Sequence, residues 1–277
     1  MDTNIPALTP AELAPYLYTG NAPLIIDVRR ANAFDDDTAT ITGAVRALPE
    51  TIAEWLPQLD RSRAIVVYCV HGHAVSQGAA TTLIAAGFNA RFLEGGISAW
   101  RESSLPLMAK QLDLGVPATI GTPTRWITRE RPKIDRIACP WLVRRFIDPQ
   151  AQFLYVPTDQ VQDAAKRERA MPYDIPGVRF THRGDACSFD AFIADFGLTD
   201  AALGELAKIV RAADTGHLNQ SPQAPGLAAI SLGLSVMYPN DHEMLAHGMT
   251  VYDALYAWLR SARGEVHNAD LFSRARS

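Results

Sequence analysis

The feature that most constrains the fold is one continuous stretch, from Ala64 to Gly87, that joins a strand to a helix. Its first five residues, AIVVY, are apolar or aromatic and mostly β-branched, which is typical of a strand buried on both faces. Val75 to Ala86 is rich in Ala, Leu and Ile, and Gly87 follows it, which predicts a helix with a glycine at its C′ position. A short loop, CVHGHA, therefore connects a buried strand to a helix.

This loop opens with Cys69, directly after the strand. A cysteine in this place lies over the N-terminus of the next helix, where unpaired backbone N–H groups and the helix dipole favour negative charge. The thiolate is the nucleophilic form of cysteine. The position therefore predicts a reactive thiol, and the alternative is a small buried cysteine that only packs at a strand end.

Two flanking segments extend the pattern. LIIDVRR, Leu24 to Arg30, reads as a second buried strand, and RFLEGGISAW, Arg91 to Trp100, as a strand, a Gly-Gly turn and a short helix. Together with YCVHGHAVSQGAA, these segments make residues 6–108 resemble a rhodanese (sulfurtransferase) domain. The resemblance implies a doubly wound α/β domain with a parallel sheet, in which Cys69 carries a persulfide sulfur cradled by the amides of residues 70–75.

The catalytic residues that this resemblance implies are Cys69, His71, Gly72, His73 and Asp27. Family members that use thiosulfate usually carry an arginine or lysine in the loop, whereas this loop offers only two histidines. An imidazole attracts a dianion less than a guanidinium does, which leaves thiosulfate as the donor open while bound sulfane sulfur is expected. The histidines either hold an anionic donor or acceptor, or only hydrogen-bond the loop backbone.

The length, net charge and cysteine content of the chain exclude several classes of protein. The chain has 277 residues, enough for two domains, and its net charge of −4 without a helix-turn-helix signature disfavours a DNA-binding regulator. It has no apolar run of about 18 residues, so we expect no transmembrane helix. Three widely spaced cysteines, Cys69, Cys139 and Cys187, argue against a disulfide framework and a cysteine-only zinc site. A chain that keeps a reactive thiol reduced suits the cytoplasm.

Beyond residue 108 the character of the chain changes. Prolines and glycines with little periodicity mark residues 109–123 as a linker, and the patterns that follow indicate a mainly helical α+β domain over residues 124–268. The predicted strands are Trp126–Thr128, Gln152–Val156 and Val178–Thr181. The predicted helices are Asp135–Ile147, which Pro140 kinks or restarts, Ser188–Phe196, Asp200–Ala213, Pro225–Val236 and Asn240–Arg260.

Basic residues gather at the start of this second domain, in TRWITRERPKIDR. Arginines beside a helix start favour an anion, because guanidinium groups and free backbone N–H groups both donate to oxyanions. The alternative is a solvated charged face with a few ion pairs. The residues predicted to bind an oxyanion are Arg129, Arg131, Lys133 and Arg136.

A histidine and two carboxylates further along predict a metal site. His182 ends a predicted strand, Asp190 lies near the start of the following helix, and Asp214 ends another helix. One imidazole with two carboxylates suits Fe, Mn or Zn and leaves coordination positions for water or substrate. The same residues can instead be helix caps and surface ion pairs. The outer candidates are Glu265 and His267, and the segment of Asp214 also brings His217 close.

Four segments of the second half resemble the C-terminal domain of ChrB-type chromate-resistance proteins, over residues 124–268. They are RPKIDRIACPWLVRRFID, FTHRGDACSFDAFIADFGL, PGLAAISLGLS and YDALYAWLR. The resemblance implies a cytosolic bacterial protein tied to chromate sensing or detoxification.

These observations favour a sulfurtransferase-like enzyme with a persulfide on Cys69, whose partner is a small sulfur donor or an oxyanion such as chromate. The alternative is a non-catalytic sensor or binding protein for chromate or sulfur stress. Neither a membrane nor a nucleic acid is an expected partner.

Overall fold

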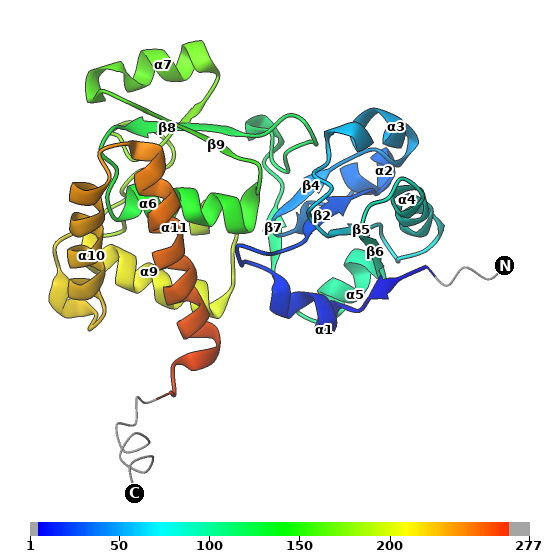
Figure 1. Ribbon diagram of the computed structural model, residues 1–277. Coiled ribbons are helices and arrows are strands. Elements are labelled where there is room, and N and C mark those ends of the chain that lie inside the picture. Colours follow the sequence, from blue (N-terminus) through cyan, green and yellow to red (C-terminus); the bar gives the residue numbers. More distant parts are fainter. Residues whose placement is uncertain (1–4, 266–277) are drawn as a thin grey trace, which may run out of the picture.

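The computed structural model describes residues 5–265, which form two halves that lie side by side (Figure 1). The N-terminal half holds a five-stranded sheet with helices around it. The C-terminal half is mainly helical around a three-stranded sheet. This confirms the predicted order and class of the two halves.

The first sheet is parallel throughout, with strand order β1-β6-β5-β2-β4. Its strands are β1 Ala7–Leu8, β2 Leu24–Asp27, β4 Ala44–Arg46, β5 Ile65–Tyr68 and β6 Ala90–Leu93. The paired strands β2 and β5 are those that the two continuous apolar runs predict, and every residue of both is buried. Because Asp27 pairs with Tyr68, their carboxyl ends lie next to each other at one edge of the sheet.

Helices cover both faces of this sheet, so the doubly wound arrangement is confirmed. The covering helices are α1 Pro10–Leu13, α3 Ile52–Trp55, α4 Ala74–Ala85 and α5 Gly96–Glu102. Alternate residues of β2 point to opposite sides: Ile26 packs in the core beneath α3 and α4, and Ile25 in the core with α1 and α5. As predicted, α4 follows the cysteine loop and ends before Gly87, which has a φ of 87°.

Short elements complete this half. They are the turns η1 Ala14–Tyr16, η2 Pro49–Thr51, η3 Leu56–Gln58 and η4 Leu112–Leu114, the helix α2 Ala31–Asp35, and the antiparallel pair β3 Ala39–Ile41 with β7 Leu107–Ala109. Between β4 and β5 the chain thus forms three short pieces, η2, α3 and η3, and α3 ends before Pro57, which has no N–H to continue the helix.

The second sheet is also parallel, with order β10-β8-β9. Its strands are β8 Arg125–Arg129, β9 Gln152–Val156 and β10 Met171–Pro172. The helix α7, Val161–Glu168, packs against Ile127 on one face of it. The prediction of a strand at Val178–Thr181 is wrong: the chain turns back through Gly177, which has a φ of 80°, and only an isolated bridge joins Phe180 to Tyr173.

Helices make up the rest of the second half, close to the predicted ranges. They are α6 Asp135–Leu142, α8 Ser188–Asp195, α9 Ala201–Asp214, α10 Ala224–Met237 and α11 Asp241–Ala257. The π-helical segments η5 Val143–Ile147 and η8 Trp258–Ala262 follow α6 and α11, and η6 Thr158–Gln160 and η7 Leu218–Gln220 are short 3-10 helices. Pro140 lies inside α6 and cannot donate to the carbonyl of Arg136, which instead accepts from the hydroxyl of Tyr173 at 3.4 Å.

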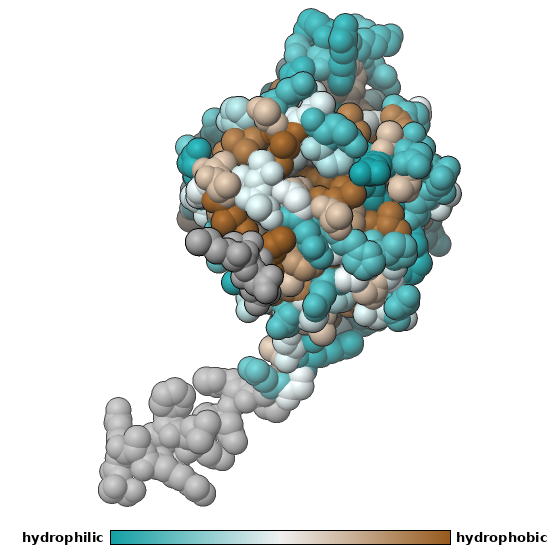
Figure 2. All heavy atoms as spheres, turned by 90° about the vertical axis from the view of Figure 1, so that its right-hand side faces the viewer, coloured by the Kyte–Doolittle hydropathy of each residue, from teal (hydrophilic) through white to brown (hydrophobic). Residues whose placement is uncertain are grey.

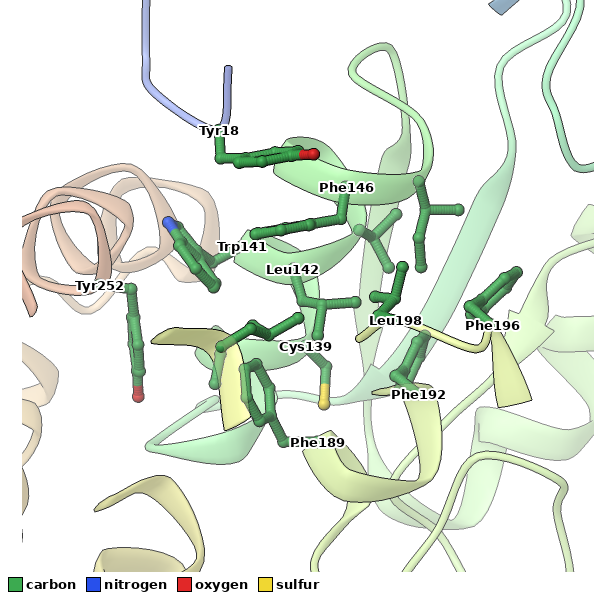
Figure 3. Packing of buried hydrophobic residues seen from close by; sticks show 14 of the residues in the cluster. Tyr18, Cys139, Trp141, Leu142, Phe146, Phe189, Phe192, Phe196, Leu198 and Tyr252 are labelled. Carbon is green, nitrogen blue, oxygen red and sulfur yellow. The ribbon is translucent and has the colours of Figure 1, made fainter. Parts of the chain in front are cut away.

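One hydrophobic core runs through both halves. The ring of Tyr18 from the first half stacks on Phe146 from the second, with centroids 4.2 Å apart, and Trp141 packs edge-on against Phe146 (Figure 3). Tyr256 also packs edge-on against Phe146. Residues 109–123, between the two halves in the sequence, are packed rather than free. The backbone N–H of Arg46 donates to the carbonyl of Ala118 at 2.7 Å, which extends pairing beyond the edge strand β4.

One face of the molecule carries both polar and apolar side chains (Figure 2). Figure 2 views the first half end on, where apolar and polar side chains mix, while the top of the picture, over α7, is hydrophilic. Within residues 5–265, no helix combines the length and apolar character needed to cross a bilayer.

Candidate functional site

Cys69 lies directly after β5, at the carboxyl edge of the first sheet. Its side chain is 6% exposed, and its Sγ atom lies 3.2 Å from the hydroxyl of Ser76 in the first turn of α4. The same hydroxyl donates to the carbonyl of His73 at 3.3 Å. The loop therefore surrounds the sulfur atom on the side where the chain enters α4.

Two glycines make this loop possible. Gly72 has a φ of 69°, and a Cβ there would approach the carbonyl oxygen of Leu93 to 2.6 Å. Gly96, with a φ of 56°, sits so close that a Cβ would collide with the carbonyl oxygens of Cys69 and Val70. The start of α5 instead fastens the loop, because Ile97 N–H donates to the carbonyl of Cys69 at 3.0 Å. The Gly-Gly turn in the sequence thus packs closely against the cysteine loop and fixes its backbone.

A cleft of about 430 Å³ opens beside Cys69. His71 and His73 line it, both exposed, with ring centroids 5.9 Å apart. Arg30 also lines it, from the end of β2, and among residues 5–265 no carboxylate pairs with its guanidinium. The sequence pattern missed Arg30 because the residue lies outside the cysteine loop, in the segment between β2 and α2. The sequence does contain a signal for Arg30: if the two buried strands are parallel, their carboxyl ends lie at the same edge of the sheet, which brings Arg30 near Cys69.

Asp27 does not line this cleft, so its predicted catalytic role needs correction. It is fully buried, bound by the guanidinium of Arg29 at 2.6 Å and by the hydroxyl of Tyr68 at 2.8 Å. Arg29 also donates to Asp37 at 2.8 Å. Asp27 therefore neutralises a buried arginine and orders the end of β2.

A second group of polar side chains meets in the other half. Asp135, His182 and Asp214 each bring one ligand-type atom within 4.8 Å of the others. The Nε2 atom of His182 lies 3.4 Å from Oδ2 of Asp135, 3.2 Å from Oδ2 of Asp214 and 3.5 Å from Oδ1 of Asp174. We call Asp135, Asp174, His182 and Asp214 the acidic-histidine cluster.

The members of the acidic-histidine cluster come from separate elements. Asp135 is the first residue of α6, Asp214 is the last of α9, and Asp174 follows β10. The residue before Asp135, Ile134, has a φ of 41°, which is strained for a β-branched residue. Hydrogen bonds hold it, since its N–H donates to Ser231 and its carbonyl accepts from the hydroxyl of Tyr252.

Crowded carboxylates change the acidity of the acidic-histidine cluster. The neighbouring Asp135 carboxylate is the main influence that raises the pKa of His182 to about 9, with Asp214 and Asp174 adding to it. Burial, followed by repulsion from Asp135, raises the pKa of Asp214 to about 8. The same two causes raise the pKa of Asp174. Negative charge in this cluster therefore needs a positive partner.

Comparison with known families covers both halves. A model described as a rhodanese-like domain matches residues 9–103, and a model described as the C-terminal domain of ChrB matches residues 126–259. The chain is a rhodanese-like domain joined to a ChrB C-terminal domain. This confirms both resemblances read from the sequence.

Individual relatives and one solved structure are similar to parts of the chain. Protein ChrB of Cupriavidus metallidurans is 37% identical to this chain over 140 residues. The matched region is 50% of this chain and 42% of that protein, so the chain spans less than half the length of this relative. The thiosulfate sulfurtransferase GlpE of Pseudomonas syringae is 33% identical over 28% of this chain and 72% of its own length. The crystal structure of a rhodanese-related protein from Thermoplasma volcanium aligns over 37% of this chain and 96% of its own, with 26% identity and a TM-score of 0.33.

In the ChrB C-terminal domain, the basic residues predicted to bind an oxyanion are mostly engaged. Arg129 and Arg136 pair with Asp174, at 2.6 and 3.3 Å, and Arg131 donates to backbone carbonyls of α10 and the segment after it. Lys133 is half-buried and forms no ion pair within residues 5–265. These four residues therefore do not converge on one anion site.

The metal-ligand prediction for the ChrB C-terminal domain is corrected in one residue. Asp190 lies outside the acidic-histidine cluster, because Arg211 binds it at 2.6 Å and its carboxylate caps α8 through the N–H of Cys187. The structure instead brings Asp135 and Asp174 to His182 and Asp214. Nothing local in the sequence indicates this, since Asp135 resembles an ordinary charged residue at a helix start.

Among the described residues, His217 and Glu265 do not join the acidic-histidine cluster either. His217 is exposed, and its Nδ1 atom lies 2.9 Å from the hydroxyl of Thr215. Glu265 is exposed at the end of the described chain, and His267 lies outside the described residues.

Proposed function

We propose that this protein is a sulfane-sulfur carrier in which Cys69 accepts a sulfur atom as a persulfide and passes it to a nucleophilic acceptor. The observation that carries the proposal is the position of Cys69 at the wall of a cleft whose rim bears His71, His73 and Arg30. A nearly buried sulfur that faces an open cleft can exchange with small molecules while the fold protects it from larger oxidants.

The proposed reaction balances in two steps. The Cys69 thiolate attacks the outer sulfur of a donor such as thiosulfate, the new S–S bond forms, and sulfite leaves with the electron pair of the bond that breaks. A nucleophile such as cyanide or a thiolate then takes the outer sulfur of the persulfide, and Cys69 leaves as a thiolate. No external oxidant or reductant is needed.

Three cationic or potentially cationic side chains suit this chemistry. Arg30, in the segment between β2 and α2, supplies the guanidinium that the loop itself lacks, and a guanidinium binds oxyanions well. His71 and His73 add ring nitrogens that can donate hydrogen bonds to an anion. A thiosulfate-type donor is therefore a reasonable substrate, in line with the activity named for the GlpE relative.

We also propose that this activity serves a response to chromate or oxyanion stress, in the cytoplasm. The similarity of the second half to Protein ChrB supports this link. The competing function is a sensor that binds sulfur or chromate without turnover.

Turnover separates the two functions. The full chain would be mixed with thiosulfate, and separately with glutathione persulfide, in the presence of cyanide, and thiocyanate would be measured. We expect multiple turnovers for the parent, none for Cys69→Ser, and nearly full activity for Cys187→Ser, a matched control because serine also caps helices well. Absence of turnover with both donors, or full activity of Cys69→Ser, would contradict the proposal.

A further inference from the structure

We propose that the ChrB C-terminal domain binds one divalent first-row transition-metal ion through Asp135, His182 and Asp214. The ligand atoms come from the start of α6, the turn before α8 and the end of α9. Three segments far apart in sequence thus deliver one imidazole nitrogen and two carboxylate oxygens to a single point.

The strongest observation is an unsatisfied oxygen. The side chain of Asp135 is 3% exposed, and its Oδ2 atom has no hydrogen-bond donor although it points into the cluster. His182 lies 3.4 Å away without the direction of a hydrogen bond. An unpaired buried carboxylate oxygen is strongly unfavourable, so a native structure normally supplies it with a donor or a cation.

The spacing of the atoms suits a metal ion. Ligands of a tetrahedral ion at about 2.1 Å lie about 3.4 Å from one another. The distances from Nε2 of His182 to the two carboxylate oxygens are 3.4 and 3.2 Å. An ion can therefore enter with small side-chain adjustments.

The charges also suit a divalent ion. Asp174 is already neutralised by Arg129 and Arg136, and its Oδ1 atom accepts from the hydroxyl of Ser188 at 2.9 Å. Asp135 and Asp214 remain, and within residues 5–265 no arginine or lysine pairs with either of them. A dication balances these two carboxylates and leaves His182 neutral.

The donor set indicates which ions fit. One imidazole with two carboxylates matches the Mn²⁺, Fe²⁺ and Zn²⁺ group, whereas the absence of thiolate ligands disfavours a closed structural zinc site. The side chain of His182 is 42% exposed, so the site opens to solvent on that side. A bound ion would keep positions for water or a small anionic ligand there.

The competing explanation is that protonated His182 is itself the cation that holds the carboxylates together. The two explanations differ in metal stoichiometry. Full-length protein without a polyhistidine tag would be freed of metal with a chelator, dialysed against Mn²⁺ or Zn²⁺, and analysed for metal per chain. We expect about one ion per chain and a higher Tm with the ion, because an ion that binds only the folded state stabilises it.

Variants locate the ion. We expect Asp214→Asn and His182→Gln to weaken binding at least tenfold while circular dichroism shows an intact fold. The controls Asp185→Asn and His217→Gln, which alter exposed residues of the same two types nearby, should bind as the parent does. Asp214→Asn is the primary variant because its side chain is only partly buried.

Two results would overturn the site. One is a parent that retains well under one ion per chain with both metals, which would leave the protonated histidine as the cation. The other is undiminished binding by both Asp214→Asn and His182→Gln, which would place the ion elsewhere. The outcome is independent of sulfur transfer, since Cys69→Ser should bind the ion like the parent.

Discussion

The cysteine cleft and the acidic-histidine cluster are built in opposite ways. The cleft comes from one short stretch, the loop between β5 and α4, with help from the end of the neighbouring strand β2. The acidic-histidine cluster draws on four segments spread from residue 135 to residue 214. A site of the first kind is encoded locally, whereas a site of the second kind exists only once the helices have packed.

The two sites nevertheless share one core, and Tyr18 tests how far they depend on each other. Tyr18→Ala removes the stack on Phe146 and should lower the free energy of unfolding by about 3–5 kcal/mol. Because the core is continuous, we expect a single unfolding transition by near- and far-ultraviolet circular dichroism, with both sites lost together.

Tyr18→Phe is the matched control for this test. It keeps the ring and loses only the hydrogen bond to Thr42, so the loss should be about 1 kcal/mol. Two separate unfolding transitions in the parent would show that the halves fold independently. They would contradict the claim that the two sites depend on one continuous core.

Gly96→Ala should damage the cysteine cleft selectively. The added Cβ collides with the carbonyls of Cys69 and Val70 at a positive φ, which should destabilise the protein by at least about 1–3 kcal/mol and abolish most sulfur transfer. Gly204→Ala is the control, because Gly204 lies within α9 with open space around it and alanine should stabilise the helix. Normal sulfur transfer by Gly96→Ala would contradict the proposed loop geometry.

Substitutions at the rim of the cleft should change donor binding more than reactivity. We expect the double variant His71→Ala/His73→Ala, and separately Arg30→Ala, to raise KM for thiosulfate about tenfold, which corresponds to about 1.4 kcal/mol. The yield of persulfide at saturating donor should stay close to that of the parent. His217→Ala, which alters an exposed histidine outside the cleft, should leave KM unchanged. An unchanged KM in both the double histidine variant and Arg30→Ala would remove these residues from the site.

The smallest effect concerns Asp195, which ties the second half to the connecting segment. The Arg183 guanidinium, together with Arg179, holds the pKa of Asp195 below its ordinary value, and the Asp195 carbonyl accepts from Gln111. A lowered pKa stabilises the fold above the unfolded-state pKa of about 3.9, and this stability is lost as pH falls through the folded-state value. Asp195→Asn should therefore lower the free energy of unfolding by about 1 kcal/mol at pH 7.

Denaturant unfolding of parent and Asp195→Asn across pH 2–7 would check this sign. The difference between them should shrink as the solution becomes acid. A difference that grows toward low pH would mean that the carboxylate is not held in its charged form by these arginines.

The local nature of the cysteine cleft explains why sequence reasoning found it. The strand, the loop, α4 and the Gly-Gly turn each follow from composition and periodicity within about 30 residues. The sequence does not reveal Arg30 as a cleft residue, because its place beside Cys69 depends on the order of the strands in the sheet. Asp27 was misjudged for a related reason: a carboxylate at a strand end can face a cleft or a buried arginine, and only packing decides which.

The acidic-histidine cluster could be predicted only in part. His182 and Asp214 drew attention because they end predicted elements, and both belong to the cluster. Asp190 was chosen for its nearness in sequence to His182, yet the turn of α8 directs it to Arg211. Asp135 stands 47 positions before His182 in the sequence, and its approach depends on the packing of α6 against α8 and α9.

The most direct test of the sulfur-carrier account is mass spectrometry of the three cysteines after brief exposure of the folded protein to thiosulfate or a polysulfide. The account predicts one added sulfur atom on the peptide that contains Cys69. It predicts none on those with Cys139 and Cys187, whose side chains are fully buried. Sulfur on no cysteine, or equal labelling of Cys69 and Cys187, would contradict it.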